Sequence, residues 1–296
     1  MNTSIDVTSP FSGNQQTSRS LSHLSAGALN RYELEAVVGS GKYSTVFRAR
    51  RLDSGQTLAV KKVQVFDMDS SMRADCIVEV KLLQALDHPN IIRYMDSFIE
   101  DNELIIELEL AEDGDLSQLI QSQSQIGELF EEGKVWDLFV QVCAACQHMH
   151  ERRMMHRDIK PSNVFVVKSG ALKLGDLGLS RFFSSKTMHA CSAVGTPYYM
   201  SPEAIRGMPY DWSSDVWSLG CLLYELATLQ SPFYQDGLNF YQLGKNITNC
   251  EYEPLPETRS TEMQELVASM IQADPQARPS VDSVHQIALE SLRKYG

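Results

Sequence analysis

A run of polar residues near the middle of the chain contains the side chains that phosphoryl transfer requires. It reads His156-Arg157-Asp158-Ile159-Lys160-Pro161-Ser162-Asn163, and thirteen residues later comes Asp176-Leu177-Gly178. Asp158 can accept the proton of a hydroxyl group, and Lys160 can contact the transferred phosphoryl group. Asn163 and Asp176 offer the oxygen atoms that hard cations such as Mg²⁺ prefer. Each piece alone occurs in ordinary surface turns, but the full set in this order predicts phosphoryl transfer.

A glycine-rich segment earlier in the chain, Gly39-Ser40-Gly41-Lys42-Tyr43-Ser44-Thr45-Val46, is flanked by sequence that predicts strands. Glycines in such a turn let backbone N–H groups approach phosphate oxygens. Two other nucleotide-binding motifs do not fit. A Walker loop requires Ser or Thr after the lysine, whereas Tyr43 follows Lys42, and position 36 is alanine where that loop has glycine. A Rossmann fingerprint requires a helix after the loop, whereas this sequence predicts a strand.

The next predicted strand contains an Ala-Val-Lys run that ends at Lys61. Side chains alternate between the two faces of a strand, so Ala59 and Lys61 share a face. We therefore expect Lys61, rather than Lys62, to reach the phosphates of a nucleotide. Glu79 lies in the following predicted helix and is the expected ion-pair partner of Lys61. Val46 and Ala59 can then sandwich an adenine ring.

The elements that must position these residues change in kind along the chain. Residues 1–30 are polar and rich in serine, and we expect them to be disordered. The next part predicts one helix at 75–86 and five strands, at 32–38, 45–50, 56–63, 91–99 and 104–110. The last part predicts helices at 116–121, 135–152, 215–228, 261–271 and 281–295, the last with Ser280 as its N-cap. The sequence thus predicts an α+β fold with a small β-rich lobe and a larger, mostly helical lobe.

Composition limits the function classes further. The 296 residues carry a net charge of −12, which argues against general nucleic-acid binding. There is no run of 18 apolar residues and no signal peptide, so we expect no membrane insertion and a cytosolic or nuclear location. The six cysteines are expected to be free thiols in that compartment. Cys143 and Cys146 form a C-x-x-C pattern, but it lies in a helical run and predicts core packing rather than metal or redox chemistry.

From Tyr32 to about Leu292 the sequence resembles eukaryotic protein kinases, and within them the NIMA-related kinases, especially their short mitotic members. The runs that carry this resemblance include Ala74–Ile77, Phe98–Leu104, Met155–Asp158, Lys173–Leu179, Arg181–Thr187, Val194–Glu203 and Leu219–Glu225. The resemblance implies a two-lobed kinase domain at 32–292, divided into an N-lobe at 32–110 and a C-lobe at 111–292.

The resemblance also implies roles for individual positions. Asp158 would be the catalytic base, Lys160 would contact the phosphoryl group, and Lys61 and Glu79 would form the activating ion pair. Asn163 and Asp176 would hold Mg²⁺. The residues expected to bind ATP are Val38, Gly39, Ser40, Gly41, Val46, Ala59, Lys61, Leu108, Glu109, Ala111, Asp115 and Phe165. Among these, Leu108 would be the gatekeeper, and the backbone of residues 109–111 would be the adenine-binding hinge.

Positions outside the nucleotide site carry structural and regulatory expectations. By resemblance, Glu203 should pair with Arg278, and Asp215 should brace the catalytic loop. Residues 176–203 would be the activation segment, in which Ser192 aligns with a serine that is phosphorylated on activation. Thr196 of the Gly-Thr-Pro run, together with the catalytic-loop lysine, implies specificity for serine or threonine.

Two positions depart from common kinase patterns. Leu177 replaces phenylalanine in the Asp-Phe-Gly motif, as is normal for this subgroup. Met95 stands where close relatives carry a tyrosine that can block the site, so inhibition by that tyrosine is not expected here. The two residues would join Leu83 and His156 in an apolar spine.

The expected function is a serine/threonine kinase that uses Mg·ATP and acts on protein substrates in cell-cycle or microtubule-linked signalling. The implied activating partner is a longer NIMA-related kinase, and the chain itself is expected to be a monomer, cytoplasmic or nuclear and at spindle or microtubule structures. Three alternatives are a pseudokinase scaffold, a small-molecule kinase and a non-catalytic mitotic adaptor. A pseudokinase would lack part of the catalytic set, a small-molecule kinase would lack the activation segment, and an adaptor would need a docking module outside the kinase domain.

Overall fold

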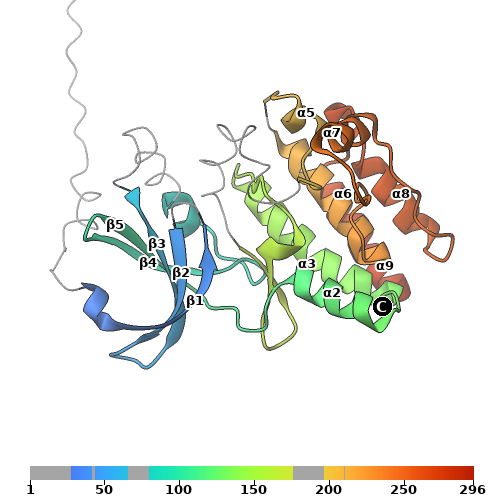
Figure 1. Cartoon of the computed structure of the whole chain (residues 1–296). Coiled ribbons are helices and arrows are strands. Elements are labelled where there is room, and N and C mark those ends of the chain that lie inside the picture. Colours follow the sequence, from blue (N-terminus) through green and yellow to red (C-terminus); the bar gives the residue numbers. More distant parts are fainter. Residues whose placement is uncertain (1–27, 42–43, 66–79, 176–196, 210) are drawn as a thin grey trace, which may run out of the picture. The chain divides into compact units, whose positions relative to one another are not determined.

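The structure is a computed structural model that describes residues 28–41, 44–65, 80–175, 197–209 and 211–296. These residues form two compact units. One unit contains residues up to 65 together with 96–107, and the other contains 80–95 and residues from 108 onward. The first is built on a β-sheet and the second mainly on helices (Figure 1). The predicted α+β fold, with a β-rich part and a helical part, is therefore confirmed.

A five-stranded sheet with the order β1-β2-β3-β5-β4 forms the basis of the first unit. A short 3₁₀ turn, η1 (Ala28–Arg31), leads into it. The strands are β1 (Tyr32–Ser40), β2 (Ser44–Arg51), β3 (Thr57–Val63), β4 (Tyr94–Glu100) and β5 (Glu103–Leu108). β1 pairs with β2, and β2 with β3, in antiparallel orientation. All five predicted strands are present.

Seven helices are labelled in the described part of the second unit: α2 (Leu116–Ile126), α3 (Glu132–Glu151), α5 (Pro202–Ile205), α6 (Trp212–Thr228), α7 (Phe240–Asn249), α8 (Thr261–Met270) and α9 (Val281–Tyr295). A small antiparallel pair, β6 (Val164–Val166) and β7 (Leu172–Leu174), follows the catalytic run, and the 3₁₀ turns η3 (Pro161–Asn163) and η5 (Pro275–Ala277) complete the unit. Ser280 caps α9 as predicted, because its hydroxyl accepts the N–H of Ser283 at 3.2 Å.

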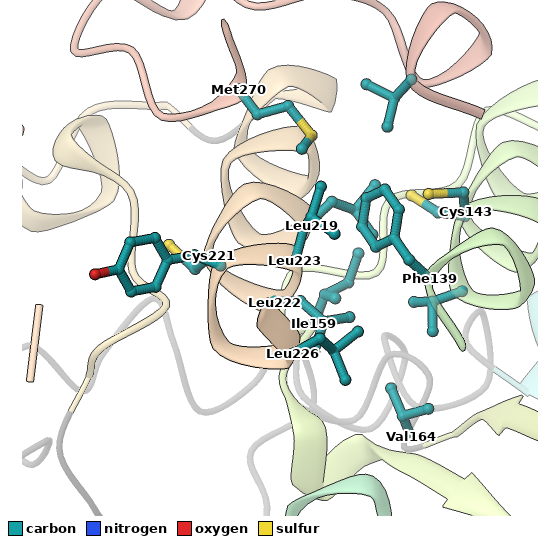
Figure 2. Close-up of a cluster of buried hydrophobic side chains, with 14 of the residues drawn as sticks. Phe139, Cys143, Ile159, Val164, Leu219, Cys221, Leu222, Leu223, Leu226 and Met270 are labelled. Carbon is teal, nitrogen blue, oxygen red and sulfur yellow. The ribbon is translucent and has the colours of Figure 1, made fainter. Parts of the chain in front are cut away.

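Helix α6 lies at the centre of this unit's apolar core. Leu219, Leu222 and Leu223 of α6 are fully buried, and Figure 2 shows them on the same side as Phe139 of α3. Ile159, the residue directly after Asp158, is also fully buried in this cluster. Burying a side chain of this size contributes about 1.5–3 kcal/mol. The polar catalytic run is thus anchored to the core through one of its own residues.

Several predicted boundaries were wrong, for physical reasons that the structure supplies. β4 begins at Tyr94 rather than at position 91, because Ile91 and Ile92 pair with Leu174 of β7. α2 continues to Ile126, well beyond position 121. α6 begins three residues earlier than predicted, since Asp211 caps it. The described end of the helix predicted at 75–86 spans residues 80–84, and its earlier part lies outside the described residues.

None of the helices that the structure describes is both long and apolar enough to cross a membrane. Cys143, Cys146 and Cys221 are buried free thiols, and Cys250 is a half-buried one. Cys143 and Cys146 are both buried in the helical core, so the C-x-x-C pattern lies on a packed part of α3, as its helical context predicts.

A buried carboxyl group on α6 makes the stability of this unit sensitive to pH. Burial raises the pKa of Glu225 to about 7, and the hydroxyl of Tyr199 donates a hydrogen bond to it. The unfolded chain releases this proton near pH 4.5, so the folded state binds more protons between about pH 4.5 and about pH 7. The free energy of unfolding therefore falls as the pH rises through this window.

Replacing Glu225 with glutamine should remove this pH dependence, because glutamine does not titrate and still offers an oxygen to Tyr199. We compare the free energy of unfolding of the variant with that of the wild type at each pH. The difference, variant minus wild type, should be up to roughly 3 kcal/mol larger at pH 8 than at pH 5. Chemical denaturation at the two pH values measures this difference. Glu265→Gln, on the exposed face of α8, is the control, and an equal response of the two variants would contradict the prediction.

Candidate active site

The catalytic loop is held in place by Asp215, a fully buried carboxylate on α6. Its two oxygens accept the backbone N–H groups of His156, at 2.9 Å, and Arg157, at 2.8 Å. Burial alone would raise the pKa of Asp215, but hydrogen bonds, first of all from His150, outweigh it and lower the pKa below its usual value. The carboxylate is therefore ionised and makes strong bonds to the loop. This confirms the prediction that Asp215 braces the catalytic loop.

Arg157 has a backbone φ of 69°, in the left-handed region that residues other than glycine rarely adopt. The two bonds from Asp215 to the N–H groups of His156 and Arg157 compensate for the strain. His156 is fully buried beside it, and both of its ring nitrogens have partners. Nδ1 accepts the N–H of Asp158 at 3.3 Å, and Nε2 donates to the carbonyl of Gly175 at 2.9 Å. These partners fix the backbone on both sides of the reactive carboxylate.

Gly175, the residue directly before Asp176, is fixed to the catalytic loop on both sides of its peptide. Besides receiving the His156 bond, it donates its N–H to the carbonyl of Asn163 at 2.9 Å. A Cβ at this position would lie 2.6 Å from the ring of Phe165, so only glycine fits without movement of that ring. Asp176 itself lies outside the described residues.

The carboxylate of Asp158 has a side-chain exposure of 34%, so a substrate can reach it. Its Oδ2 accepts hydrogen bonds from Nζ of Lys160 at 2.7 Å and from Nδ2 of Asn163 at 2.8 Å. Within the described part of the chain, Lys160 and Asn163 both donate to the same oxygen of Asp158, Oδ2. This arrangement leaves Oδ1 to face an incoming hydroxyl group, which is the geometry that a general base needs.

The side-chain amide of Asn163 is buried. Within the described residues, its hydrogen bonds go only to Asp158, which therefore fixes its orientation. Nδ2 donates to the backbone carbonyl of Asp158 at 2.7 Å as well as to its carboxylate. Both N–H groups are thereby engaged, and the amide oxygen remains to coordinate a cation. Oxygen ligands suit Mg²⁺, so the donor chemistry at this position fits the metal that the sequence predicts.

The residues predicted to face a nucleotide in the first unit lie on one face of the sheet. Gly39 pairs with Val46 across β1 and β2, and Val46 pairs with Lys61 across β2 and β3. Directly opposed residues point to the same side of a sheet. Ala59 shares that face with Lys61, two residues along β3. Both are buried, with exposures of 6% and 7%.

The structure distinguishes the two neighbouring lysines of β3. Lys62 points to the opposite face and forms an ion pair with Glu103 on β5 at 3.1 Å. Lys62 and Glu103 are partly exposed, which is typical of a surface pair of small energetic value. Lys61 and Lys62 therefore lie on opposite faces of β3, as the alternation of side chains along a strand predicts.

The remaining loop residues lie at the ends of β1 and β2. Val38 is exposed, and Ser40 is the last residue of β1. The N–H of Gly41 donates to the carbonyl of Ser44 at 2.7 Å and closes the turn. Positions 42 and 43, within this turn, lie outside the described residues.

Leu108, the predicted gatekeeper, is the last residue of β5, and the predicted hinge begins directly after it at Glu109. The N–H of Glu109 donates to the carbonyl of Arg93 at 2.8 Å, and its carboxylate pairs with Lys173 of β7 at 3.0 Å. Ala111 follows in a stretch without helix or strand. The predicted hinge is thus tied to β7 and to the chain that enters β4.

Asp115, expected to bind ATP, also has a structural role. It is the N-cap of α2, and its carboxylate accepts the N–H of Gln118 at 3.1 Å. A backbone bridge joins Asp115 to Phe165 of β6. Asp115 and Phe165, both expected to bind ATP, are therefore brought together within the second unit.

Five predicted functional residues cannot be placed, because they lie outside the described residues: Glu79, Asp176, Leu177, Ser192 and Thr196. The roles assigned to them remain predictions from the sequence.

Glu203 and Arg278 form a buried, two-pronged ion pair, with both N···O distances at 2.8 Å. Burial acts to raise the pKa of Glu203, but hydrogen bonds from Arg278 and Ser214 outweigh it and bring the pKa to about 2. The guanidinium also lies over the ring of Trp217, 5.1 Å from its centre. The predicted pairing is confirmed.

Two residues with clear structural roles were not identified from the sequence. His150 of α3 contacts the carboxylate of Asp215 at 2.9 Å and so supports the brace of the catalytic loop. Gly175 allows the close approach of Phe165. A glycine directly before the Asp-Leu-Gly run was a usable indication of close packing, whereas nothing local linked His150 to a residue 65 positions away.

Comparison with known proteins identifies the family of the domain. A sequence model of the protein kinase domain matches residues 32–289. Mouse serine/threonine-protein kinase Nek3 is 38% identical over 256 residues, which cover 86% of this chain and 49% of the mouse protein. Human Nek11 is 36% identical over 260 residues, which cover 87% of this chain and 40% of the human protein. A Dictyostelium discoideum protein described as a probable serine/threonine-protein kinase, nek2, is 37% identical over 261 residues, 86% of this chain and 62% of that protein.

The chain spans between 21% and 62% of the length of the curated relatives that it matches. The similarity therefore concerns the kinase domain of these proteins.

Proposed function

Because this chain belongs to the protein kinase family, we propose that it transfers the γ-phosphoryl group of Mg·ATP to serine and threonine hydroxyls of protein substrates. The observation that carries the proposal is the arrangement around Asp158. A partly exposed carboxylate has one oxygen engaged by Lys160 and Asn163, and its peptide is held to the buried Asp215 through the two preceding residues. Such a carboxylate is oriented before substrate arrives, which is the main requirement for this reaction.

Each residue of the loop has one task in the proposed reaction. Asp158 orients the substrate hydroxyl and accepts its proton as the oxygen attacks the γ-phosphorus. Lys160, 2.7 Å from Asp158, carries the positive charge that stabilises the phosphoryl oxygens in the transition state. Lys61 would hold the phosphates of ATP. Asn163 keeps Asp158 in position through its two N–H groups.

Asn163 and Asp176 would hold the metal. When bound, Mg²⁺ neutralises charge on the phosphate oxygens of ATP. The amide oxygen of Asn163 is the atom that the hydrogen bonds to Asp158 leave for this purpose.

The preference for serine and threonine rests on the names of the relatives, several of which are described as serine/threonine-protein kinases. The resemblance to short NIMA-related kinases supports a role in cell-cycle or microtubule-linked signalling, in the cytoplasm or nucleus and at spindle structures. It also supports a monomer that a longer kinase of the same family activates, with Ser192 as the phosphorylated position.

A peptide-library assay with Mg·ATP tests the function directly. We expect phosphate on serine- and threonine-containing peptides, none on peptides whose only hydroxyl is tyrosine, and no transfer when EDTA removes the metal. Absence of transfer to any peptide, from protein that binds ATP, would favour a scaffold function instead.

A further inference from the structure

Three side chains with metal-binding atoms converge behind the catalytic loop. The Sγ atom of Cys146 lies 3.5 Å from Nε2 of His150, and the same nitrogen lies 2.9 Å from Oδ2 of Asp215. All three ligand atoms are within 4.8 Å of one another. Cys146 and His150 are four residues apart on α3, and therefore share a helix face that α6 completes with Asp215.

A single ring nitrogen of His150 faces both of the other side chains, so its proton can serve only one of them. His150 uses a single nitrogen, Nε2, toward both the thiol of Cys146 and the carboxylate of Asp215. If that nitrogen carries a proton, the proton serves Asp215, and the nitrogen has no lone pair to accept the thiol proton. A cation in place of the proton would satisfy all three atoms at once.

The chemistry and spacing of the three atoms match Zn²⁺ better than Mg²⁺ or Ca²⁺. Zinc accepts thiolate, imidazole and carboxylate ligands together, whereas the other two require oxygen. With Zn–S of about 2.3 Å and Zn–N of about 2.0–2.1 Å, tetrahedral geometry places sulfur and nitrogen about 3.5 Å apart. That is the distance between Cys146 and His150. Nε2 of His150 and Oδ2 of Asp215, now 2.9 Å apart, would move to about 3.3 Å to share the ion in the same geometry.

One of the three side chains, His150, also lines a surface pocket. The pocket has a volume of about 400 Å³, and His150 forms part of its wall together with Glu151, Arg153, Trp212 and Asp282. The side chain of His150 is 10% exposed, whereas Cys146 and Asp215 are fully buried. His150 is thus the one of the three side chains that has any contact with solvent.

We propose that Cys146, His150 and Asp215 form a binding site for a borderline divalent cation, with Zn²⁺ as the best match and water as the fourth ligand. This site is separate from the Mg²⁺ position at Asn163 and would not contact ATP. It is nevertheless coupled to the catalytic loop, because Asp215 Oδ2 also accepts the N–H of His156. Occupancy would exchange the His150 bond for a metal bond and leave the His156 and Arg157 bonds in place.

Zinc binding by the whole chain tests the proposal. Metal-free protein, kept reduced, would be titrated with Zn²⁺ in competition with a chromophoric chelator. We expect one Zn²⁺ per chain, bound at least ~10-fold more weakly by Cys146→Ala, since even loss of a supporting partner costs about 10–100-fold in affinity. Cys143→Ala is the matched control, because this fully buried cysteine lies three residues away on α3 and faces the apolar core (Figure 2). Equal affinity in the two variants would overturn the site.

A measurement on the wild-type protein keeps the proposal testable if Cys146→Ala does not fold. X-ray absorption at the zinc edge, on protein loaded with one equivalent of Zn²⁺, reports the ligand atoms directly. The expected shell contains one sulfur, with nitrogen and oxygen as the other ligands. A shell without sulfur, or with two or more sulfurs, would assign the ion to other residues and refute the proposal.

Discussion

Asp158→Asn is expected to lower kcat for peptide phosphorylation by at least ~10²-fold, the loss that follows removal of a positioned base. Asparagine has the shape of aspartate and can still accept bonds from Lys160 and Asn163, so the loop should keep its geometry. It cannot take up the hydroxyl proton. Steady-state kinetics with a saturating peptide measures the loss, and the thermal unfolding midpoint should change by no more than a few degrees.

Asp137→Asn is the control for this substitution. Asp137 is a half-buried aspartate on α3 that pairs with Lys134. Both side chains are 46% exposed, so replacing Asp137 should leave kcat unchanged. If Asp158→Asn retained wild-type kcat, the proton would have to be accepted elsewhere, and the proposed mechanism would be wrong.

Lys61→Met should have a comparable effect through a different step. Methionine fills the buried position of Lys61 but carries no charge to hold the phosphates of ATP. Loss of one preorganised electrostatic group at the reacting centre typically costs about 10²–10³ in kcat. The same kinetic assay, extended over ATP concentration, would separate weaker ATP binding from slower transfer.

Lys62→Met provides a control at the adjacent residue. This substitution removes the partly exposed ion pair between Lys62 and Glu103 on the opposite face of β3. Such a pair contributes about 0–1 kcal/mol to the free energy of unfolding. We expect little change in kcat and a small change in stability. A large loss in Lys62→Met, with Lys61→Met fully active, would reverse the assignment of the two lysines.

Much of the fold could be predicted from periodicity, because its signals are local. The five strands, and helix α9 with its Ser280 cap, were predicted at or near their observed positions. The candidate catalytic residues Asp158, Lys160 and Asn163 could also be placed together, since they lie in one short run and contact one another within a single loop.

Helix α7 was missed although it carries a capping box. Asn239 accepts the N–H of Gln242, and the side chain of Gln242 returns a bond to the N–H of Asn239. The helix contains Gly244 and buries only Leu243 and Ile247, so its apolar stripe is short. The Asn-x-x-Gln spacing was the usable indication. The predicted start of β4 was wrong for the opposite reason, because here the local signal was misleading. Ile91 has a strand-like sequence, but its pairing partner lies on β7.

Contacts between distant helices could not be derived from local patterns. The Glu203–Arg278 pair and the brace at Asp215 were expected only from resemblance to kinases. The convergence of Cys146 and His150 on Asp215 depends on how α3 packs against α6, which no spacing in the sequence encodes. The i, i+4 spacing of Cys146 and His150 gave half of that site, and the third ligand required the structure.

The bonds from Asp215 to the N–H groups of His156 and Arg157 also determine how the loop unfolds. Most loops fluctuate independently of the helices around them, and their amide hydrogens exchange quickly with solvent. Here the loop's amides are bonded to a fully buried side chain on the central helix, and Ile159 is packed into the same core. Opening the loop therefore removes hydrogen bonds from a buried carboxylate and exposes an apolar side chain, both of which cost free energy. We expect the amide hydrogens of His156 and Arg157 to exchange with solvent more slowly than those of an exposed loop.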